Sequence, residues 1–436
     1  MAKIKEIFSL VKGTLQSSKC TPGDYNFITA SKDWKTHNEF SNDHEALIFA
    51  AAASGSLGRT HYVNGKFITS DLCFIITPKD NNKFPIDLKF YHIIFQTLKD
   101  DIVKNTKAGT SKEAIGLKSL GEYDIPYISI EKQREISAKF LSLTDISENF
   151  TDESKNQLSL ISQLRQAFLK EAMQGKLVSN ETSDGKTGAQ LLAEIRTEKG
   201  KLIQEKKIKK GKPLPLISEE EIPFEIPENW AWCRLGDISD LITKGSSPKW
   251  QGVKYVDSYE EGILFVTSKN VNHYKIDLTK ATFVTESFNK VEPRSILQKG
   301  DLLTNIVGGS IGRTAIYDLD YNANINQAVC LIRLNEILQK LFILKLFNSD
   351  YIISEMFAYQ FSPGRANLSL SNLENFKIPL PPLEIQNRIV SKLEELMNYC
   401  DDLETAVKES QNYNEQLLQQ VLREALEVKD VAGEVK

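Results

Sequence analysis

The sequence predicts an α+β protein in which two mixed α/β globules are separated by two long antiparallel helices, paired as a coiled coil, with a pseudo-twofold internal repeat. Three observations lead to this prediction. Segments return at one constant offset, long stretches carry apolar residues at helical spacing, and short apolar strands run into glycine-rich turns. We expect the first globule at 1–124, the first helix at 125–178, a linker at 179–226, the second globule at 227–377 and the second helix at 378–430.

The repeat is clearest in the predicted helices. Two segments about 40 residues apart both return at an offset of 253 residues (378 − 125 and 416 − 163). The stretch between them therefore has a fixed length without insertions, as expected for a long helix. The matches are Ile125-Pro126 and Gln133 with Ile378-Pro379 and Gln386, and Gln163-Leu164 with Gln416-Leu417.

Both predicted helices carry apolar residues in steps of three and four, which suit pairing with another helix. In the second helix these are Ile389, Leu393, Leu396, Cys400, Leu403, Val407, Leu417 and Val421, and in the less regular first helix Ile136, Phe140, Leu143, Leu158, Ile161, Phe168 and Ala172. A polar break at Ser410 and Asn414 weakens the second stripe, and Pro381-Pro382 marks its start. About 45 helical residues span roughly 68 Å. Two alternatives stay open: an ordinary amphipathic helix packed within one domain, and parallel pairing, which the linker is long enough to permit.

The globules are predicted from short strands and twinned turns. The turn 55–60 (Gly-Ser-Leu-Gly-Arg-Thr) is matched by 309–314 (Gly-Ser-Ile-Gly-Arg-Thr), and 27–29 by 265–267. The offset drifts here, which indicates loops of different length on a shared scaffold. Strands are expected at 46–50, 72–76, 301–307 and 328–332, and a short helix near 189–207 in the linker.

Composition excludes several classes of protein. The five cysteines are scattered without metal-ligand spacing, which favours reduced thiols in the cytoplasm over disulfides or a zinc site. The start of the chain does not resemble a signal peptide, and no apolar run is long enough to span a membrane. A net charge of −4 does not itself indicate nucleic acid, so DNA binding would depend on local basic surface.

Seven motifs follow one another in an order that resembles the specificity subunits of type I restriction-modification systems, and the resemblance covers essentially the whole chain. They are Gln174-Gly175-Lys176-Leu177-Val178, Leu191-Leu192-Ala193-Glu194-Ile195, Gly211-Lys212-Pro213-Leu214-Pro215, Pro223-Phe224-Glu225-Ile226-Pro227-Glu228-Asn229-Trp230, Trp232-Cys233-Arg234-Leu235-Gly236-Asp237-Ile238, Ile378-Pro379-Leu380-Pro381-Pro382-Leu383 and Gln386-Asn387-Arg388-Ile389-Val390. Two departures are present. The first globule has no counterpart of Trp230, and Lys132 and Ile385 stand where the family has an acidic residue before Gln133 and Gln386.

The resemblance implies a non-catalytic subunit with two target-recognition domains, each binding one half of a split double-stranded DNA site. It also implies docking of two modification (methyltransferase) subunits and, in the larger complex, of restriction subunits. S-adenosylmethionine would then belong to the methyltransferase, and ATP and Mg to the restriction subunit, so we expect no cofactor in this chain and no membrane partner. Antiparallel helices would place one globule at each end and act as a ruler for the unread spacer.

Candidate DNA-binding residues were chosen where a Gly, Pro or Ser turn carries donors able to reach bases or phosphates. The alternative for each is a merely solvated loop. In the first globule they are Lys12, Thr14, Lys32, Lys35, Lys107 and Lys112, and in the second Lys244, Ser246, Lys249, Trp250, Lys269, Asn270, Arg365 and Asn367. For the twinned Arg59 and Arg313, phosphate contact and a structural salt bridge both stay open. A basic run from Lys199 to Lys212 could contact DNA or a partner, or be a solvated helix face.

Two other functions were weighed. A free-standing DNA-modifying enzyme would need a cofactor-binding or catalytic motif, and we find no Walker A lysine, no Asn-Pro-Pro-Tyr-like motif and no metal or triad pattern among the five histidines. A coiled-coil scaffold without a DNA role would leave two large globules with basic loops unexplained.

Overall fold

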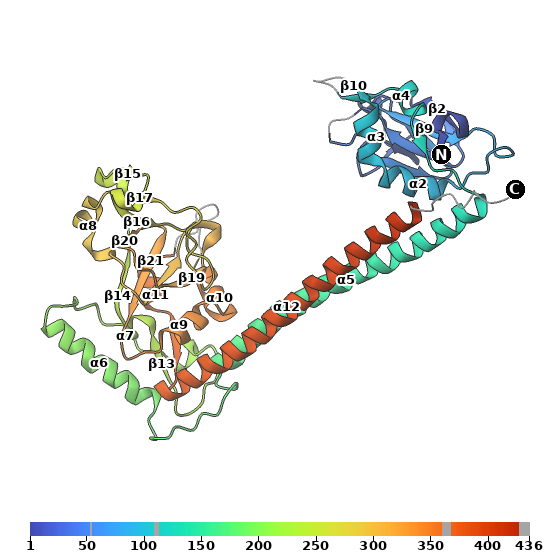
Figure 1. The fold of residues 1–436 in the computed structure, drawn as a ribbon. Helices are drawn as coiled ribbons and strands as arrows, with labels where there is room; N and C mark the ends of the chain where they lie inside the picture. The colour runs from blue at the N-terminus through green and yellow to red at the C-terminus, as the bar shows by residue number, and fades with distance from the viewer. Residues whose placement is uncertain (53–54, 109–112, 360–367, 427–436) are drawn as a thin grey trace. The chain divides into compact units, whose positions relative to one another are not determined.

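The computed structural model describes residues 1–52, 55–108, 113–359 and 368–426 and divides the chain into two compact units (Figure 1). The first unit comprises Met1–Asn156 and the chain from Val407 on, and the second comprises Gln157–Ala406. Each unit thus holds one globule together with part of each long helix. No helix in the described ranges is long and apolar enough to cross a membrane.

In its described residues the first globule is built from short strands and four short helices. The strands are β1 (Ala2–Lys3), β2 (Phe8–Lys12), β3 (Tyr25–Ile28), β4 (Lys35–His37), β5 (Asn42–Asp43), β6 (Ala46–Ala50), β7 (Thr60–Val63), β8 (Lys66–Thr69), β9 (Cys73–Pro78), β10 (Lys107–Ala108), β11 (Ala114–Ile115) and β12 (Asp124–Ile125). The helices are α1 (Ile4–Ile7), α2 (Leu88–Thr97), α3 (Lys99–Thr106) and α4 (Leu117–Gly121).

These elements form three layers: helices, the sheet β2-β9-β6-β7, and the sheet β4-β3-β8-β5, in which β3 and β8 run parallel. Strand β6 lies in the middle and is buried on both faces. Leu47 and Phe49 pack with the helix residues, while Ile48 packs with the second sheet. Because successive side chains of a strand point to opposite faces, this double burial explains the unbroken apolar run of β6.

The second globule has the same plan. Its strands are β13 (Ala231–Arg234), β14 (Ser239–Lys244), β15 (Tyr255–Val256), β16 (Ile263–Val266), β17 (Phe283–Val284), β18 (Asp301–Asn305), β19 (Thr314–Tyr317), β20 (Ala323–Ile325), β21 (Val329–Leu334) and β22 (Lys377–Leu380). Its helices are α7 (Leu235–Ile238), α8 (Ser287–Val291), α9 (Lys340–Phe347), α10 (Asp350–Ala358) and α11 (Leu370–Glu374), and α6 (Gly188–Gln204) lies in the preceding linker.

Strand order confirms the internal repeat. The sheet β14-β21-β18-β19 corresponds to β2-β9-β6-β7, and β16 pairs in parallel with β20 as β3 does with β8. The scaffold also matches at single hydrogen bonds. Ile115 N donates to Ala51 O at 2.8 Å, and Leu368 N donates to Ile306 O at 2.9 Å, again 253 residues along the chain (368 − 115).

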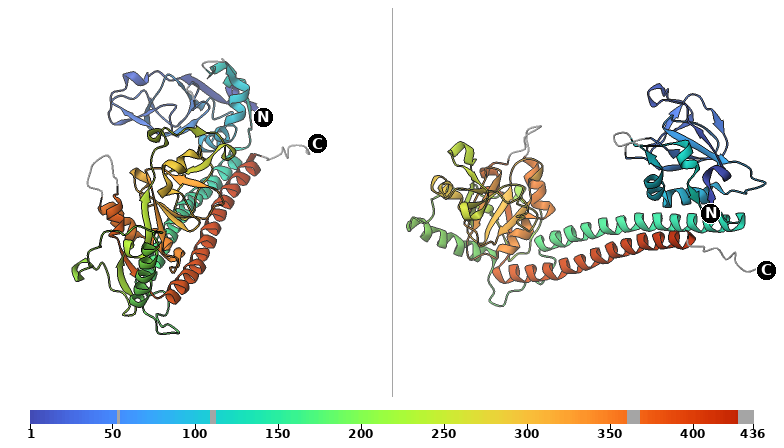
Figure 2. Two further views of the ribbon diagram at one scale, coloured as in Figure 1. Left: turned by 90° about the vertical axis from the view of Figure 1, so that its left-hand side faces the viewer. Right: turned by 45° about the horizontal axis from the view of Figure 1, so that its top comes forward.

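The two long helices are α5 (Ile130–Met173) and α12 (Leu383–Leu426), which lie side by side in Figures 1 and 2. Each begins five residues after its predicted start, because strand residues and prolines precede it. In the second unit Arg165 of α5 pairs with Asp401 of α12 at 2.6 Å, while the end of α5 packs against the start of α12. This arrangement is antiparallel, as predicted.

The predicted apolar stripe of α12 is only partly buried. Ile389, Leu393 and Cys400 are buried, whereas Leu417 is 57% exposed, so the expectation that it lies in the seam is wrong. The side chain of Val421 lies outside the described residues. In the first unit the polar break serves as a contact, because Asn414 Nδ2 donates to Ser147 Oγ of α5 at 2.8 Å. A polar pair of this kind fixes helix register.

A buried glutamine ties each long helix to its globule. Gln133 Oε1 accepts from Asp87 N at 2.8 Å, and its Nε2 donates to Ile128 O at 2.8 Å. In the second unit Gln386 Oε1 accepts from Gln339 N at 3.1 Å, and its Nε2 donates to Pro381 O at 2.8 Å. Both glutamines are fully buried. The same amide therefore joins the start of the long helix to the start of α2 or α9.

The basic run after the first helix does not form one solvated face. Lys199 of α6 is half-buried, and its ammonium donates to Gly236 O at 2.6 Å, Asp237 O at 3.2 Å and Ser239 O at 2.7 Å. Burial lowers the pKa of Lys199. Because its donors face backbone carbonyls around α7, Lys199 holds α6 against the globule and is unavailable to DNA.

Glu384 makes a pH-dependent link between the linker and α12. Ser183 N and Oγ donate to Glu384 Oε2 at 2.8 and 2.9 Å, and Arg388 pairs with its other oxygen. The Ser183 amide, then Arg388 and the Ser183 hydroxyl, lower the pKa of Glu384 to about 2. A carboxyl with a lowered folded-state pKa stabilises the fold above its unfolded pKa of about 4.3, and this contribution is lost as the pH falls toward 2.

We therefore expect Glu384→Gln to lose part of the acid sensitivity of the wild type. Urea unfolding at several pH values between 6 and 2 should show the two free energies of unfolding converging as the pH falls through this window. Parallel curves over the whole range would show that the link does not titrate as described.

Candidate nucleic-acid interface

In the first globule two candidate loops meet at the carboxyl ends of the parallel strands β3 and β8. The turn after Lys12 is held there because Gly13 N donates to Cys73 O at 2.9 Å and Thr14 N to Thr69 O at 3.1 Å. A Cβ on Gly13 would lie 2.2 Å from Ser70 O, so only glycine permits this close approach. The loop after β3, which carries Lys32, begins at the same edge.

The second globule repeats this arrangement. The turn after Lys244 crosses the end of β20, and a Cβ on Gly245 would lie 1.7 Å from Ile325 O. Asn326 N donates to Val266 O at 3.0 Å, which places the loop after β16 beside it, just as Ser70 N donates to Ile28 O in the first globule. The same edge of the same scaffold therefore presents the candidate loops in both repeats.

The twinned arginines connect these loops to the turn before the next strand. Arg59 Nη1 donates to Ala30 O at 3.0 Å and to Ser56 Oγ at 3.2 Å. Arg313 Nη1 donates to Asn272 Oδ1 at 3.4 Å. Both side chains are half-buried. These contacts are hydrogen bonds that brace the loop, whereas the sequence had left a salt bridge open. Each guanidinium group has five N–H donors, so further donors remain.

Most remaining candidates present their side chains to solvent. Trp250, in the 3₁₀ turn Pro248–Gln251, is 78% exposed, and Ser246 is half-buried. The exposed candidates are Lys12, Thr14, Lys32, Lys35, Lys107, Lys244, Lys249 and Lys269. Lys107 forms an ion pair with Glu113 at 2.7 Å. Lys112, Arg365 and Asn367 lie outside the described residues.

The prediction for Asn270 is wrong. Its side chain is fully buried, Oδ1 accepts from Thr267 N and Oγ1 at 2.9 Å, and Nδ2 donates to Asp277 O at 3.0 Å and Lys280 O at 3.3 Å. All the donors and acceptors of the amide are committed to the loop after β16. Asn270 therefore shapes the loop and cannot reach a base.

Sequence reasoning missed an anchor in the loop after β3. Trp34 Nε1 donates to His61 Nδ1 of β7 at 3.2 Å, and the rings meet edge to face. Burial, aided by the charge of Arg59 and by His92, lowers the pKa of His61. The neutral ring offers Nδ1 as an acceptor, which fixes Trp34 between the candidates Lys32 and Lys35. The sequence signal for this anchor was the aromatic residue Trp34 between the loop lysines Lys32 and Lys35.

Cys73, Cys233 and Cys330 are buried thiols in the described part of the chain. In the described ranges no group of three or more His, Cys, Asp or Glu side chains could hold a metal ion. Burial raises the pKa of Cys73 to about 12 and also raises the pKa values of the Cys233 and Cys330 thiols. These thiols stay protonated at neutral pH and are poor nucleophiles.

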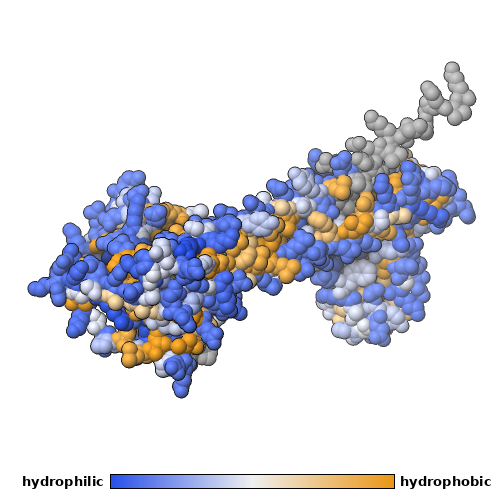
Figure 3. Space-filling model, turned by 90° about the horizontal axis from the view of Figure 1, so that it is seen from below, coloured by the Kyte–Doolittle hydropathy of each residue, from blue (hydrophilic) through white to orange (hydrophobic). Residues whose placement is uncertain are grey.

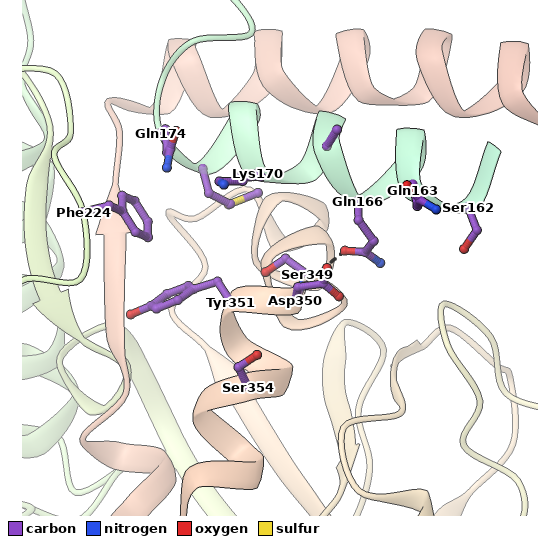
Figure 4. Close-up of a pocket in the computed structure, with 12 residues that line it drawn as sticks. Ser162, Gln163, Gln166, Lys170, Gln174, Phe224, Ser349, Asp350, Tyr351 and Ser354 are labelled. Atoms are coloured by element: carbon purple, nitrogen blue, oxygen red, sulfur yellow. Dashed lines mark hydrogen bonds between the residues drawn. The ribbon is translucent and has the colours of Figure 1, made fainter. Parts of the chain in front are cut away.

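A cavity of about 590 Å³ lies in the second unit between α5 and α10 (Figure 4). Phe224, Tyr351 and Met173 form its apolar wall, and Gln166 Oε1 accepts from Asp350 N at 3.2 Å. The labelled side chains contribute an amide rim and an aromatic wall, which suit packing with an apolar surface.

A family model described as the type I restriction modification DNA specificity domain matches residues 1–160 and 227–411. The chain belongs to this family. Among curated relatives, the type I restriction enzyme EcoAI specificity subunit of Escherichia coli is 31% identical over 270 residues, covering 60% of this chain and 44% of that protein. The MjaVIII specificity subunit of Methanocaldococcus jannaschii is 26% identical over 328 residues, covering 74% and 66%. The match thus spans less than half of the EcoAI subunit.

Two solved structures share the fold. A chain from a study of the structural basis underlying complex assembly and conformational transition of the type I R-M system aligns with a TM-score of 0.65 at 18% identity, covering 98% of this chain and 96% of that one. The HsdS subunit from Thermoanaerobacter tengcongensis aligns with a TM-score of 0.58 at 19% identity and the same coverage. These likenesses extend over both globules and both long helices.

Proposed function

We propose that this specificity-family chain binds an asymmetric, bipartite site in double-stranded DNA and performs no chemistry itself. One observation carries the proposal: both globules present their exposed candidate loops at the same edge of the same scaffold, while the loops differ in sequence. A backbone scaffold that both repeats share, with different side chains on its loops, suits two related domains that bind different half-sites. The helix pair would then act as the ruler for the spacer.

The proposed partners are two modification (methyltransferase) subunits and, in the larger complex, restriction subunits. Exposed apolar side chains on the long helices support docking, since such surface marks interaction sites. In the first unit they include Ile146 and Tyr413, and in the second Leu160 and Tyr399. Figure 3 shows apolar surface along the helical part of the molecule. S-adenosylmethionine would belong to the modification subunits, and ATP and Mg to the restriction subunits, all acting in the cytoplasm.

The lysines of the second globule supply a direct test of DNA binding. We expect Lys244→Ala, Lys249→Ala and Lys269→Ala together to weaken binding of the complex with modification subunits and to flatten its salt dependence. Each lost phosphate contact lowers the slope of log K against log salt by about 0.9, so three contacts lower it by about 3. Fluorescence anisotropy with cognate duplex from 50 to 300 mM salt measures the slope.

A matched triple variant removes the same charge elsewhere in the second unit. Lys186, Lys290 and Lys299 are exposed and lie just before α6, on α8 and before β18. Their replacement by alanine should leave the slope near the wild-type value. Equal slopes for both triple variants would contradict the proposed interface, and methyl transfer by the purified chain alone would contradict its lack of chemistry.

A further inference from the structure

The loop after β16 in the second globule continues from exposed Lys269 to a braced turn. Its recognition loop, residues 268–276, is closed by a bridge between Val271 and Ile276. Asn305 Nδ2 donates to Ser268 O at 3.0 Å and to Val271 O at 3.2 Å, which holds the loop on β18. These contacts fix the recognition loop to the sheet beneath it.

Tyr274 in this loop has an unusual backbone. Its φ is +66°, in the left-handed region that bulky residues rarely adopt, and its N–H donates to Thr314 O at 2.9 Å. The ring lies over Lys345 of α9, with Nζ 4.9 Å from the ring centroid. The neighbouring His273 bonds Asn348 at the end of α9 at 2.6 Å. The surrounding contacts thus hold Tyr274 in a conformation that places its ring on Lys345.

Lys345 in turn faces the helix pair. A cavity of about 500 Å³ is lined by Tyr274 and Lys345 together with Arg165 of α5 and Glu394 and Asp401 of α12. Burial lowers the pKa of Lys345, and the charges of Glu394 and Asp401 act against this. Asp401 also pairs with Arg165. The side chain of Lys345 thus faces both the recognition loop and the carboxylates of α12.

We propose that Tyr274 is a positioning residue for spacer length: through Lys345 it sets the orientation of the recognition loop on the helix pair. The inference rests on the proposed function. If the helix pair measures the spacer, the accepted spacer length depends on how rigidly the recognition loop is held relative to the helix pair. Tyr274 is 41% exposed, so its ring lies at the surface and contributes little to the packing of the hydrophobic core.

The first globule anchors its loop differently. The position 253 residues before Lys345 is His92 (345 − 253), and His92 bonds Thr60 O at 3.0 Å. The corresponding loop is held by Trp34 on His61 of β7, within the sheet of its own globule. The contact of Tyr274 with Lys345 therefore belongs to the second globule. Substitutions at Tyr274 should leave recognition by the first globule unchanged.

The test measures spacer tolerance separately from base recognition. Methylome sequencing first defines the wild-type spacer, n base pairs, and methyl transfer by the complex with modification subunits is then measured on duplexes with n − 1, n and n + 1. Tyr274→Asn removes the ring and tolerates the left-handed backbone. We expect it to raise the rate on n − 1 or n + 1 relative to n by about tenfold, as loss of a cation–π contact can.

The companion variants make the outcome specific. Lys345→Met should reproduce the effect, and Tyr274→Phe should retain the wild-type profile. Tyr321→Asn, at a tyrosine between β19 and β20 that is 40% exposed, is the matched control. An unchanged spacer profile in Tyr274→Asn would overturn the inference, as would altered base preference at either half-site. Failure of the wild-type complex to methylate any spaced duplex would instead overturn the proposed function.

Discussion

Replacing Gln386 by alanine is expected to lower the free energy of unfolding by about 2–5 kcal/mol. The substitution removes a buried hydrogen bond to Pro381 O and a partly buried one from Gln339 N, and both backbone groups lose this partner. Each buried polar group left unsatisfied costs about 1–3 kcal/mol, and the Gln386 side chain is itself fully buried. Gln133→Ala should act in the same way in the first unit.

The measurement is chemical denaturation followed by circular dichroism. Gln416, an exposed glutamine of the same helix α12, supplies the control, and its alanine variant should stay within about 0.5 kcal/mol of the wild type. A loss below about 1 kcal/mol for Gln386→Ala would mean that the joint between α12 and α9 relaxes or hydrates, and that this amide does not hold it.

Replacing Arg333 by methionine is the second large change and is expected to cost about 3 kcal/mol. Arg333 Nε and Nη2 each lie 2.7 Å from the carboxylate of Asp301, which is 1% exposed. Without the arginine a buried carboxylate in strand β18 is left uncompensated, and that state is far less favourable than the intact pair. Thermal and urea unfolding of the purified chain measure the loss.

A double variant separates this explanation from simple loss of packing. Asp301→Asn keeps an acceptor for Gln298 N, so adding it to Arg333→Met should recover part of the lost stability. The exposed pair of Arg196 with Asp237, at 3.5 Å, is the control, and Arg196→Met should cost less than about 1 kcal/mol. No recovery in the double variant would argue that Arg333 acts through its methylene groups.

The architecture was largely predictable because it depends on patterns that recur. The offset of 253 residues indicated the repeat and both helices, and the apolar run at 46–50 indicated a strand. Start positions of the helices were predicted five residues early because Ile125 and Ile378 belong to strands. The repeat marks equivalent positions and does not by itself say where an element begins.

The candidate site was predictable as a set of loops but not residue by residue. Asn270 and Lys199 have the side chains that DNA contacts need, yet their hydrogen bonds are used within the fold. Tyr274 gave no signal, because its left-handed backbone follows from the contacts of the whole loop with β19 and α9. Residue type states what a side chain is able to bind, and only the packed surroundings decide whether that ability is already used.

The close approach of Gly13 and Gly245 to backbone carbonyls has a thermodynamic consequence for the lysines before them. The main chain at Lys12 and Lys244 is held as the last residue of β2 and β14 and by the tightly packed glycine that follows, so contact with a phosphate would restrict mainly side-chain torsions. Ordering a lysine side chain costs up to about 2 kcal/mol, whereas ordering a free loop adds about 1–2 kcal/mol for every backbone residue. The backbone entropy around Lys12 and Lys244 is therefore lost on folding, and binding of an anion by these two lysines would cost less conformational entropy than binding by a free loop.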